Sequence, residues 1–216
     1  MGARHAHGDG ALDAAWRALD RFDVEALQSH LEQAASFLPA EAVCFELVLP
    51  LMREVGDAWA KGRIGIAQEH LVSAALRTLL GSILRLTRAT ERHRVVFATL
   101  EGELHEFGLL CAALLGAVAR ISPVYLGPNI PVADVLDAVR RTSAVAVVIA
   151  VVTERTDADA IEGIAEIVRG AGSRVEVLVG GARGRPFVVR AAAVGARWVD
   201  SLAEFAAECR RMAAAR

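Results

Sequence analysis

The chain has 216 residues, and its 24 basic and 26 acidic side chains give a formal net charge of −2. This balance argues against a protein that grips nucleic acid through a basic surface of its own. Hydrophobic residues make up 54% of the chain but aromatic residues only 5%, so alanine, valine and leucine supply most of the apolar material. Such a composition is sufficient for a sizeable core and excludes general disorder.

Neither a membrane span nor a secretory signal is predicted. The longest wholly apolar run, residues 144–152, suits a buried strand, whereas a membrane helix needs about 20 residues. No apolar segment follows Met1. The three cysteines (Cys44, Cys111 and Cys209) are widely spaced and form no C-x-x-C pair, so we expect reduced thiols in a cytoplasmic protein.

Residues 1–90 carry apolar side chains at helical spacing, which predicts a bundle of four helices joined by short links. Asp23 is suited to cap the second helix, and Pro39 suits the first turn of the third. Pro50 lies inside the third pattern, where its ring and missing N–H predict a kink.

Residues 91–216 alternate between short β-rich runs and helical stretches. The expected strands are residues 95–99, 123–126, 144–152, 175–179 and 197–199. The expected helices are residues 106–120, 132–141, 157–169, 186–194 and 202–213. Five β–α units predict a Rossmann-like, flavodoxin-like α/β domain with a parallel five-stranded sheet. Ligands of such sheets bind outside the carboxyl ends of the strands, so the loops after the first, third and fourth strands are the candidate site.

The loop after the first expected strand carries residues that suit a metal ligand. A neutral imidazole at His105 is able to bind a metal while Glu103 holds its other ring nitrogen. Gly102 and Gly108 permit close approach of the backbone to a ligand. A solvated or capping histidine is the alternative interpretation of this residue taken alone.

The spacing downstream of this loop resembles the D-x-H-x-x-G, S-x-L and G-G pattern of cobalamin-binding Rossmann domains. After Glu103-x-His105-x-x-Gly108, 41 residues lead to Ala150-Val151-Val152 at the S-x-L place, and 27 more lead to Gly180-Gly181. The resemblance implies cobalamin bound base-off, with His105 as the lower axial cobalt ligand and the nucleotide tail passing the glycine pair. An ordinary strand-to-helix turn is the alternative for that pair.

Ala150 departs from the pattern in a way that bears on mechanism. In cobalamin enzymes the acidic residue and the serine form a relay behind the ligand histidine. Ala150 has no hydroxyl, so we expect this relay to be incomplete, which weighs against methyl-transfer chemistry.

The helical half carries an independent match. Trp59, followed after nine residues by Glu69-His70, resembles the W-x(9)-E-H signature of the helical cap in CarH-type and LitR-type light-responsive regulators. In that family the tryptophan covers the upper face of the corrin and the Glu-His pair lines the space for the upper ligand. Tyr125-Leu126-Gly127 and Pro131 resemble the family's Y-L-G-x-x-x-P turn. The alternatives are a bundle-core aromatic at Trp59 and a solvated face at Glu69-His70.

The resemblance implies one cofactor site with a single protein ligand to the metal, His105, and no catalytic residue. The implied cofactor-binding residues are Trp59, Glu69, His70, Glu103, Leu104, His105, Glu106, Phe107, Gly108, Leu126, Gly127, Ala150, Val152, Thr153, Gly180 and Gly181. Adenosylcobalamin is the expected form, with hydroxocobalamin and methylcobalamin as alternatives.

Three functions are compatible with this resemblance. The first, which we favour, is a non-enzymatic, stand-alone sensory module similar to the AerR-type antirepressors. Such a module would bind cobalamin and respond to light or cofactor form by acting on a partner regulator or by homo-oligomerisation, without contacting DNA or membrane. The others are a corrinoid carrier subunit of a methyltransferase and a cobalamin storage or delivery protein. Light sensors of this type carry a histidine directly after the tryptophan, where this chain has Ala60.

Overall fold

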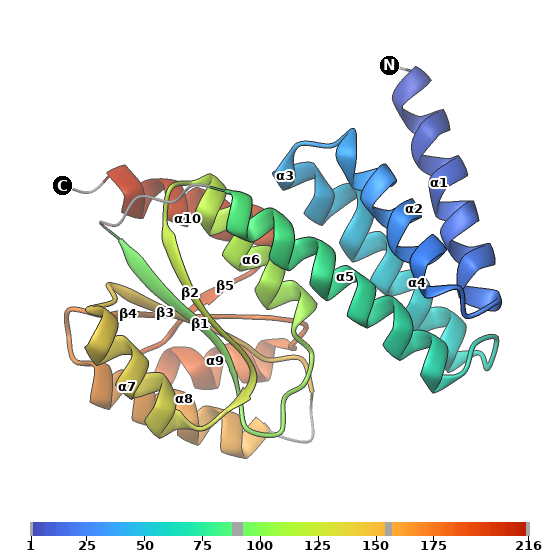
Figure 1. The fold of residues 1–216 in the computed structure, drawn as a ribbon. Helices are drawn as coiled ribbons and strands as arrows, with labels where there is room; N and C mark the ends of the chain where they lie inside the picture. The colour runs from blue at the N-terminus through green and yellow to red at the C-terminus, as the bar shows by residue number, and fades with distance from the viewer. Residues whose placement is uncertain (1, 88–92, 154–156, 215–216) are drawn as a thin grey trace. The chain divides into compact units, whose positions relative to one another are not determined.

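The computed structural model describes residues 2–87, 93–153 and 157–214, and the chain divides into two compact units, Met1–Leu86 and Thr87–Arg216 (Figure 1). The boundary expected at residue 90 lies outside the described residues. Each unit has its own core and is described by itself below.

The first unit is helical. Its elements are α1 (Gly2–Asp20), α2 (Val24–Ser36), α3 (Ala40–Ala42), the π-helix η1 (Val43–Val48), α4 (Leu49–Ala60) and α5 (Ile66–Leu86). Asp23 caps α2 as expected, because its Oδ1 accepts the Ala26 N–H at 3.0 Å. Helix α2 packs against α1 and α5, and α4 packs against α5, which confirms the expected bundle of helices.

The perturbation expected at Pro50 takes the form of a π-helical turn. The helices α3, η1 and α4 follow one another without a break. The Leu49 N–H bonds to the Cys44 carbonyl, five residues earlier. A proline inside an α-helix removes one hydrogen bond, and its ring collides with the carbonyl four residues before it. The wider turn immediately ahead of Pro50 accommodates that ring without ending the helix.

Leucines spaced along the helices form the core of this unit. Leu27, Leu31, Leu76 and Leu80 are almost fully buried, and burying each such side chain stabilises the fold by about 1.5–3 kcal/mol. Trp16 is half-buried against the same core, in keeping with a packing role.

The second unit is a five-stranded α/β fold. Its strands are β1 (Arg94–Leu100), β2 (Ser122–Ile130), β3 (Ala146–Ala150), β4 (Glu176–Gly180) and β5 (Arg197–Val199). Its helices are α6 (Phe107–Val118), α7 (Val132–Thr142), α8 (Asp157–Ala171), α9 (Arg185–Ala193) and α10 (Leu202–Ala214). All strand pairs are parallel and the order is β2-β1-β3-β4-β5, so the expected fold class is confirmed.

The helices cover both faces of the sheet. Helices α7, α8 and α9 pack on one face, over a core that includes Val147, Ile149 and Ile164, while α6 and α10 pack together on the other (Figure 1). Residues of β3 are buried on both faces, which explains the continuous apolar run that predicted this strand. The strand order reverses between β1 and β3, and this switch point is where ligands of such sheets bind.

Four charged side chains join β4, β5 and α10. Arg197 bonds to Glu176 and Glu208, each at 2.8 Å, and Arg211 bonds to the same two carboxylates at 3.1 and 2.7 Å. These hydrogen bonds, chiefly from Arg197, lower the pKa of Glu208. The ring ties the last helix to the edge of the sheet.

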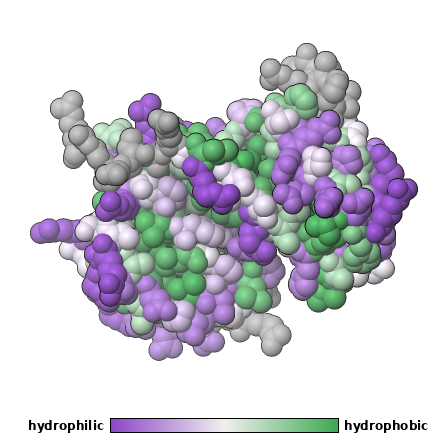
Figure 2. Space-filling model, viewed as in Figure 1, coloured by the Kyte–Doolittle hydropathy of each residue, from purple (hydrophilic) through white to green (hydrophobic). Residues whose placement is uncertain are grey.

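The visible surface mixes hydrophilic side chains with smaller apolar groups (Figure 2). The large apolar residues exposed on the chain include Phe37, Ile66, Leu86 and Leu104. Among the described residues, no helix is both long and apolar enough to span a bilayer.

Candidate functional site

Glu103, in the loop between β1 and α6, is the centre of a hydrogen-bonded network at the switch point. Only 3% of its side chain is exposed. Its Oε2 accepts the backbone N–H groups of Val152 and Thr153, both at 2.7 Å, from the chain that follows β3. Its Oε1 accepts the N–H of His105 at 3.0 Å and contacts the Nδ1 of the same residue at 2.7 Å.

These bonds keep the Glu103 carboxylate ionised. Burial alone would raise its pKa, but hydrogen bonds from the amides of Thr153, His105 and Val152 and from the His105 ring outweigh burial and lower the pKa to about 2. The site therefore holds a fixed negative charge at neutral pH.

The position of Glu103 determines the tautomer of His105. Because an ionised carboxylate only accepts hydrogen bonds, the Nδ1 of a neutral His105 must carry the proton and donate it to Oε1. The lone pair is then on Nε2, which has no hydrogen-bond partner among the described residues, and the side chain is 63% exposed. A ring held this way by a carboxylate is the usual arrangement of a metal-ligating histidine.

Thr153 supplies the hydroxyl that Ala150 lacks. Its Oγ1 lies 3.2 Å from Oε1 of Glu103 and 3.2 Å from Nδ1 of His105. Ala150 itself offers no hydroxyl, as expected, but the carboxylate has a hydroxyl neighbour in Thr153. The serine place of the motif, Ala150, is buried at the end of β3, whereas Thr153, three residues later, reaches the carboxylate directly.

The rest of the His105 segment divides into exposed and buried residues. Leu104 is 69% exposed, and Gly108 is exposed in open space, whereas Phe107 is half-buried. Glu106, at the start of α6, is buried and accepts the Tyr125 hydroxyl at 2.9 Å. That bond brings the β2 segment with Leu126 and Gly127 to the same end of the sheet as the histidine loop.

The glycine pair after β4 is explained by close packing of backbone. A Cβ on Gly181 would lie 2.0 Å from the Val151 carbonyl oxygen, and its φ of +141° also favours glycine. Gly180 bonds through its own carbonyl to the Val151 N–H at 2.9 Å. The pair therefore closes the end of β4 against the segment after β3, next to the network described above.

In the helical unit, Trp59 is 53% exposed near the end of α4, so the alternative of a bundle-core aromatic is wrong. Glu69 accepts the Ser73 hydroxyl at 2.7 Å and contacts the His70 Nδ1 at 2.7 Å on α5. His70, like His105, is thus oriented by a carboxylate and is largely exposed.

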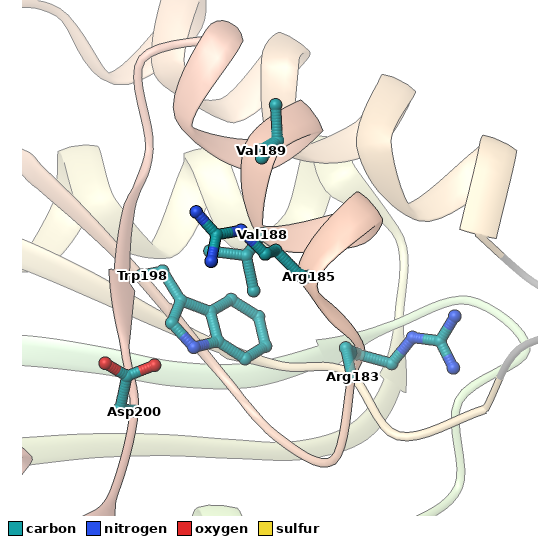
Figure 3. Close-up of a pocket in the computed structure, with 6 residues that line it drawn as sticks. All are labelled: Arg183, Arg185, Val188, Val189, Trp198 and Asp200. Atoms are coloured by element: carbon teal, nitrogen blue, oxygen red, sulfur yellow. The ribbon is translucent and has the colours of Figure 1, made fainter.

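A hollow of about 430 Å³ lies where β4 and β5 lead into α9 and the segment after β5, and Figure 3 shows its lining. The Trp198 indole forms one wall, with Arg185, Val188 and Asp200 around it, while Arg183 points away and pairs with Asp157. None of the residues predicted for the cofactor lines this hollow.

Sequence reasoning missed two polar residues beside the site, Thr99 at the end of β1 and Asn129 at the end of β2. The Thr99 hydroxyl donates to the Glu103 carbonyl, and the Asn129 amide oxygen accepts the Gly102 N–H. A threonine inside an otherwise apolar strand was the available signal for the first of them.

The fold of the chain is shared with corrinoid proteins. The chain superposes on the monomethylamine corrinoid protein of Methanosarcina barkeri with a TM-score of 0.71, covering 91% of this chain and 95% of that one at 15% identity, a likeness of fold alone. Residues 11–83, within the helical unit, match the family model for a B12 binding domain.

Two characterised proteins are similar in sequence at modest identity. The HTH-type transcriptional repressor CarH of Myxococcus xanthus is 28% identical over 83% of this chain, which spans about 60% of the length of that repressor. The dimethylamine corrinoid protein 3 of Methanosarcina acetivorans is 25% identical over 70% of this chain and 73% of its own length. The chain is thus related to both a regulator and a corrinoid protein.

The described residues fit a corrin cofactor. His105 presents one exposed nitrogen lone pair backed by a buried, ionised carboxylate, which is suited to holding the metal of such a cofactor. If a corrin is bound, His105 would be the residue of this loop that holds its metal.

Proposed function

We propose that this chain is a cobalamin-binding sensory module in which His105 is the lower axial ligand of a base-off cofactor. The observation that carries the proposal is the contact of 2.7 Å between His105 Nδ1 and Glu103 Oε1, which leaves Nε2 with the lone pair. The B12 binding domain match and the relation to CarH support the same assignment.

The chain's own residues have distinct roles in this proposal. Glu103 holds the imidazole and fixes its tautomer, and Thr153 and the amides after β3 hold Glu103. Trp59, Glu69 and His70 contribute to selection of the upper ligand, as the family resemblance implies. Adenosylcobalamin, when bound, would supply a cobalt–carbon bond that light can break, and methylcobalamin and hydroxocobalamin are the competing forms.

The test is an absorption spectrum of the chain titrated with adenosylcobalamin in the dark and again after illumination. Wild type should give a base-off, histidine-ligated spectrum, and His105→Ala should lose most of the affinity or leave the cofactor base-on. His30→Ala on α2 is the matched control and should behave as wild type. If His105→Ala reproduces the wild-type spectrum and affinity, His105 is not the ligand.

Signalling requires a second measurement. Light scattering or analytical ultracentrifugation before and after illumination should show a change of oligomeric state, or of binding to a partner regulator. A cobalamin complex whose assembly is indifferent to light and to the cofactor form would instead indicate storage or delivery.

A carrier role in methyl transfer is the second candidate, and one observation favours it. Thr153 places a hydroxyl 3.2 Å from the Glu103 carboxylate, which removes the objection raised by Ala150. The relation to a dimethylamine corrinoid protein points the same way. Methylation of the reduced cobalamin complex by a methylamine–methyltransferase system would support the carrier role, whereas photosensitive assembly would support the sensor.

A further inference from the structure

Thr99 carries a buried hydroxyl that bonds both to the loop after β1 and to Asn129 at the end of β2. The residue is fully buried in β1, where its neighbours are apolar. Its Oγ1 donates to the Glu103 carbonyl at 2.5 Å and accepts the Asn129 N–H at 2.9 Å. A polar group buried in a strand is stabilising only when it is satisfied in this way.

Asn129 binds the same loop from the end of β2. Its Oδ1 accepts the Gly102 N–H at 2.8 Å, and its N–H also lies 3.2 Å from the Glu103 carbonyl. Its φ of +61° is a left-handed conformation that asparagine tolerates better than most residues. Thr99 and Asn129 together, hereafter the loop brace, fix the backbone of residues 102 and 103.

Among the described residues, the hydrogen bonds of the loop brace reach His105 through Glu103. In this part of the chain, the His105 backbone N–H and ring bond to the Glu103 carboxylate, and the ring also lies within hydrogen-bond distance of the Thr153 hydroxyl. The Glu103 backbone, in turn, is held by the loop brace and by the bond of its N–H to the Leu100 carbonyl at 3.0 Å. A displacement of the Glu103 backbone would therefore move the buried Glu103 carboxylate and the His105 imidazole together.

We infer that Thr99 and Asn129 are positioning residues for the His105 ligand. The inference rests on the proposed function for its cobalamin readout. It also makes a claim about the cofactor-free chain: the brace holds His105 predominantly in the tautomer with the proton on Nδ1.

The test compares isosteric and conservative variants. Thr99→Val removes both hydrogen bonds at nearly constant volume, and Thr99→Ser restores the hydroxyl. Asn129→Gly keeps the positive φ without the amide, and Asn129→Asp keeps the acceptor oxygen. Thr142→Val, which deletes the hydroxyl bonded to the Ala138 carbonyl in α7, is the matched control.

Two readouts separate the brace from the proposed function. Long-range ¹H–¹⁵N NMR of the cofactor-free chain reports the His105 tautomer, and a titration with adenosylcobalamin reports affinity. We expect Thr99→Val and Asn129→Gly to mix the tautomers and to weaken binding about tenfold, while the serine, aspartate and Thr142→Val variants stay close to wild type.

The outcomes are distinct. Wild-type tautomer populations in both Thr99→Val and Asn129→Gly would overturn the inference, whatever affinity the cobalamin titration gives. A shifted tautomer in these variants, together with a wild type that does not bind cobalamin through His105, would uphold the brace and refute the proposed function. If Thr99→Val does not fold, Asn129→Gly, which is changed at an exposed residue, decides the question alone.

Discussion

Replacing Glu103 with glutamine tests the central network of the site. The variant keeps the shape of the side chain but turns one acceptor oxygen into an N–H₂ donor. If its oxygen takes the Oε2 place, it still accepts the Val152 and Thr153 amides, but its N–H₂ then faces His105. The His105 Nδ1 must then accept a hydrogen bond, which places the proton on Nε2 and removes the lone pair that a metal needs.

The size of the effect follows from the pKa. A fall from 4.5 to about 2 corresponds to about 3 kcal/mol of stability that the ionised carboxylate contributes. Since the folded-state pKa is the lower one, this contribution is complete above about pH 4.5 and is lost as the pH falls through about 2. About 0.8 kcal/mol should be gone by about pH 4, and about 2 kcal/mol by about pH 3.

Urea unfolding followed by circular dichroism between pH 7 and pH 3 measures this directly. The free energy of unfolding of Glu103→Gln should lie about 2–3 kcal/mol below that of wild type at neutral pH, and the gap should narrow as the pH falls. Glu101→Gln, at an exposed position in the same loop, is the matched control and should follow wild type throughout. Parallel curves for wild type and Glu103→Gln down to pH 3 would refute the reasoning.

Three further substitutions test other features. Gly181→Ala should lower the free energy of unfolding by more than about 2 kcal/mol, because its Cβ would meet a backbone carbonyl. Gly172→Ala, which has open space at a positive φ, should lower the free energy of unfolding by about 1 kcal/mol. Equal losses in urea unfolding would exclude the close approach to the carbonyl as the cause. Trp59→Ala should weaken the binding of adenosylcobalamin more than that of hydroxocobalamin in spectroscopic titrations, and equal losses would rule out a role in selecting the upper ligand. Glu208→Gln should lower the free energy of unfolding by less than about 1 kcal/mol at low salt and by still less in 1 M NaCl, because its partner Arg197 is partly exposed. A large loss of stability that does not depend on salt in urea unfolding would contradict this.

The sequence predicted the architecture well because periodicity decides it. The alternation of short apolar runs with helical stretches located all five strands of the sheet, and parallel β–α units leave few topologies to choose from. Strand ends were less accurate: the run at 144–152 extends beyond β3 (Ala146–Ala150) because apolar residues continue into the loop that bonds Glu103. Composition alone does not show where a buried run stops pairing.

The details of the site were harder to predict because they depend on contacts between distant residues. The spacing of the motif indicated that Ala150 occupies the position of a hydroxyl-bearing serine. The chain after β3 instead brings the Thr153 hydroxyl to the Glu103 carboxylate. The bonds of Thr99 and Asn129 to the His105 loop join residues on two strands, so no local pattern reveals them. The exposure of Trp59 likewise depends on which side of α4 faces the other helices.

The π-helix η1 determines which way the side chains of α4 face. A π-helical turn amounts to one residue inserted into an α-helix, and each residue advances the helix by about 100°. Everything after Val48 is therefore rotated in phase by roughly that angle relative to a helix without the insertion. Leu51, Val55 and Ala58 lie on the buried side in the observed phase, and Trp59, one step further round, is left facing outward. Removing a single residue from η1 would either swing that indole away from its present direction or force the apolar stripe of α4 out of the core.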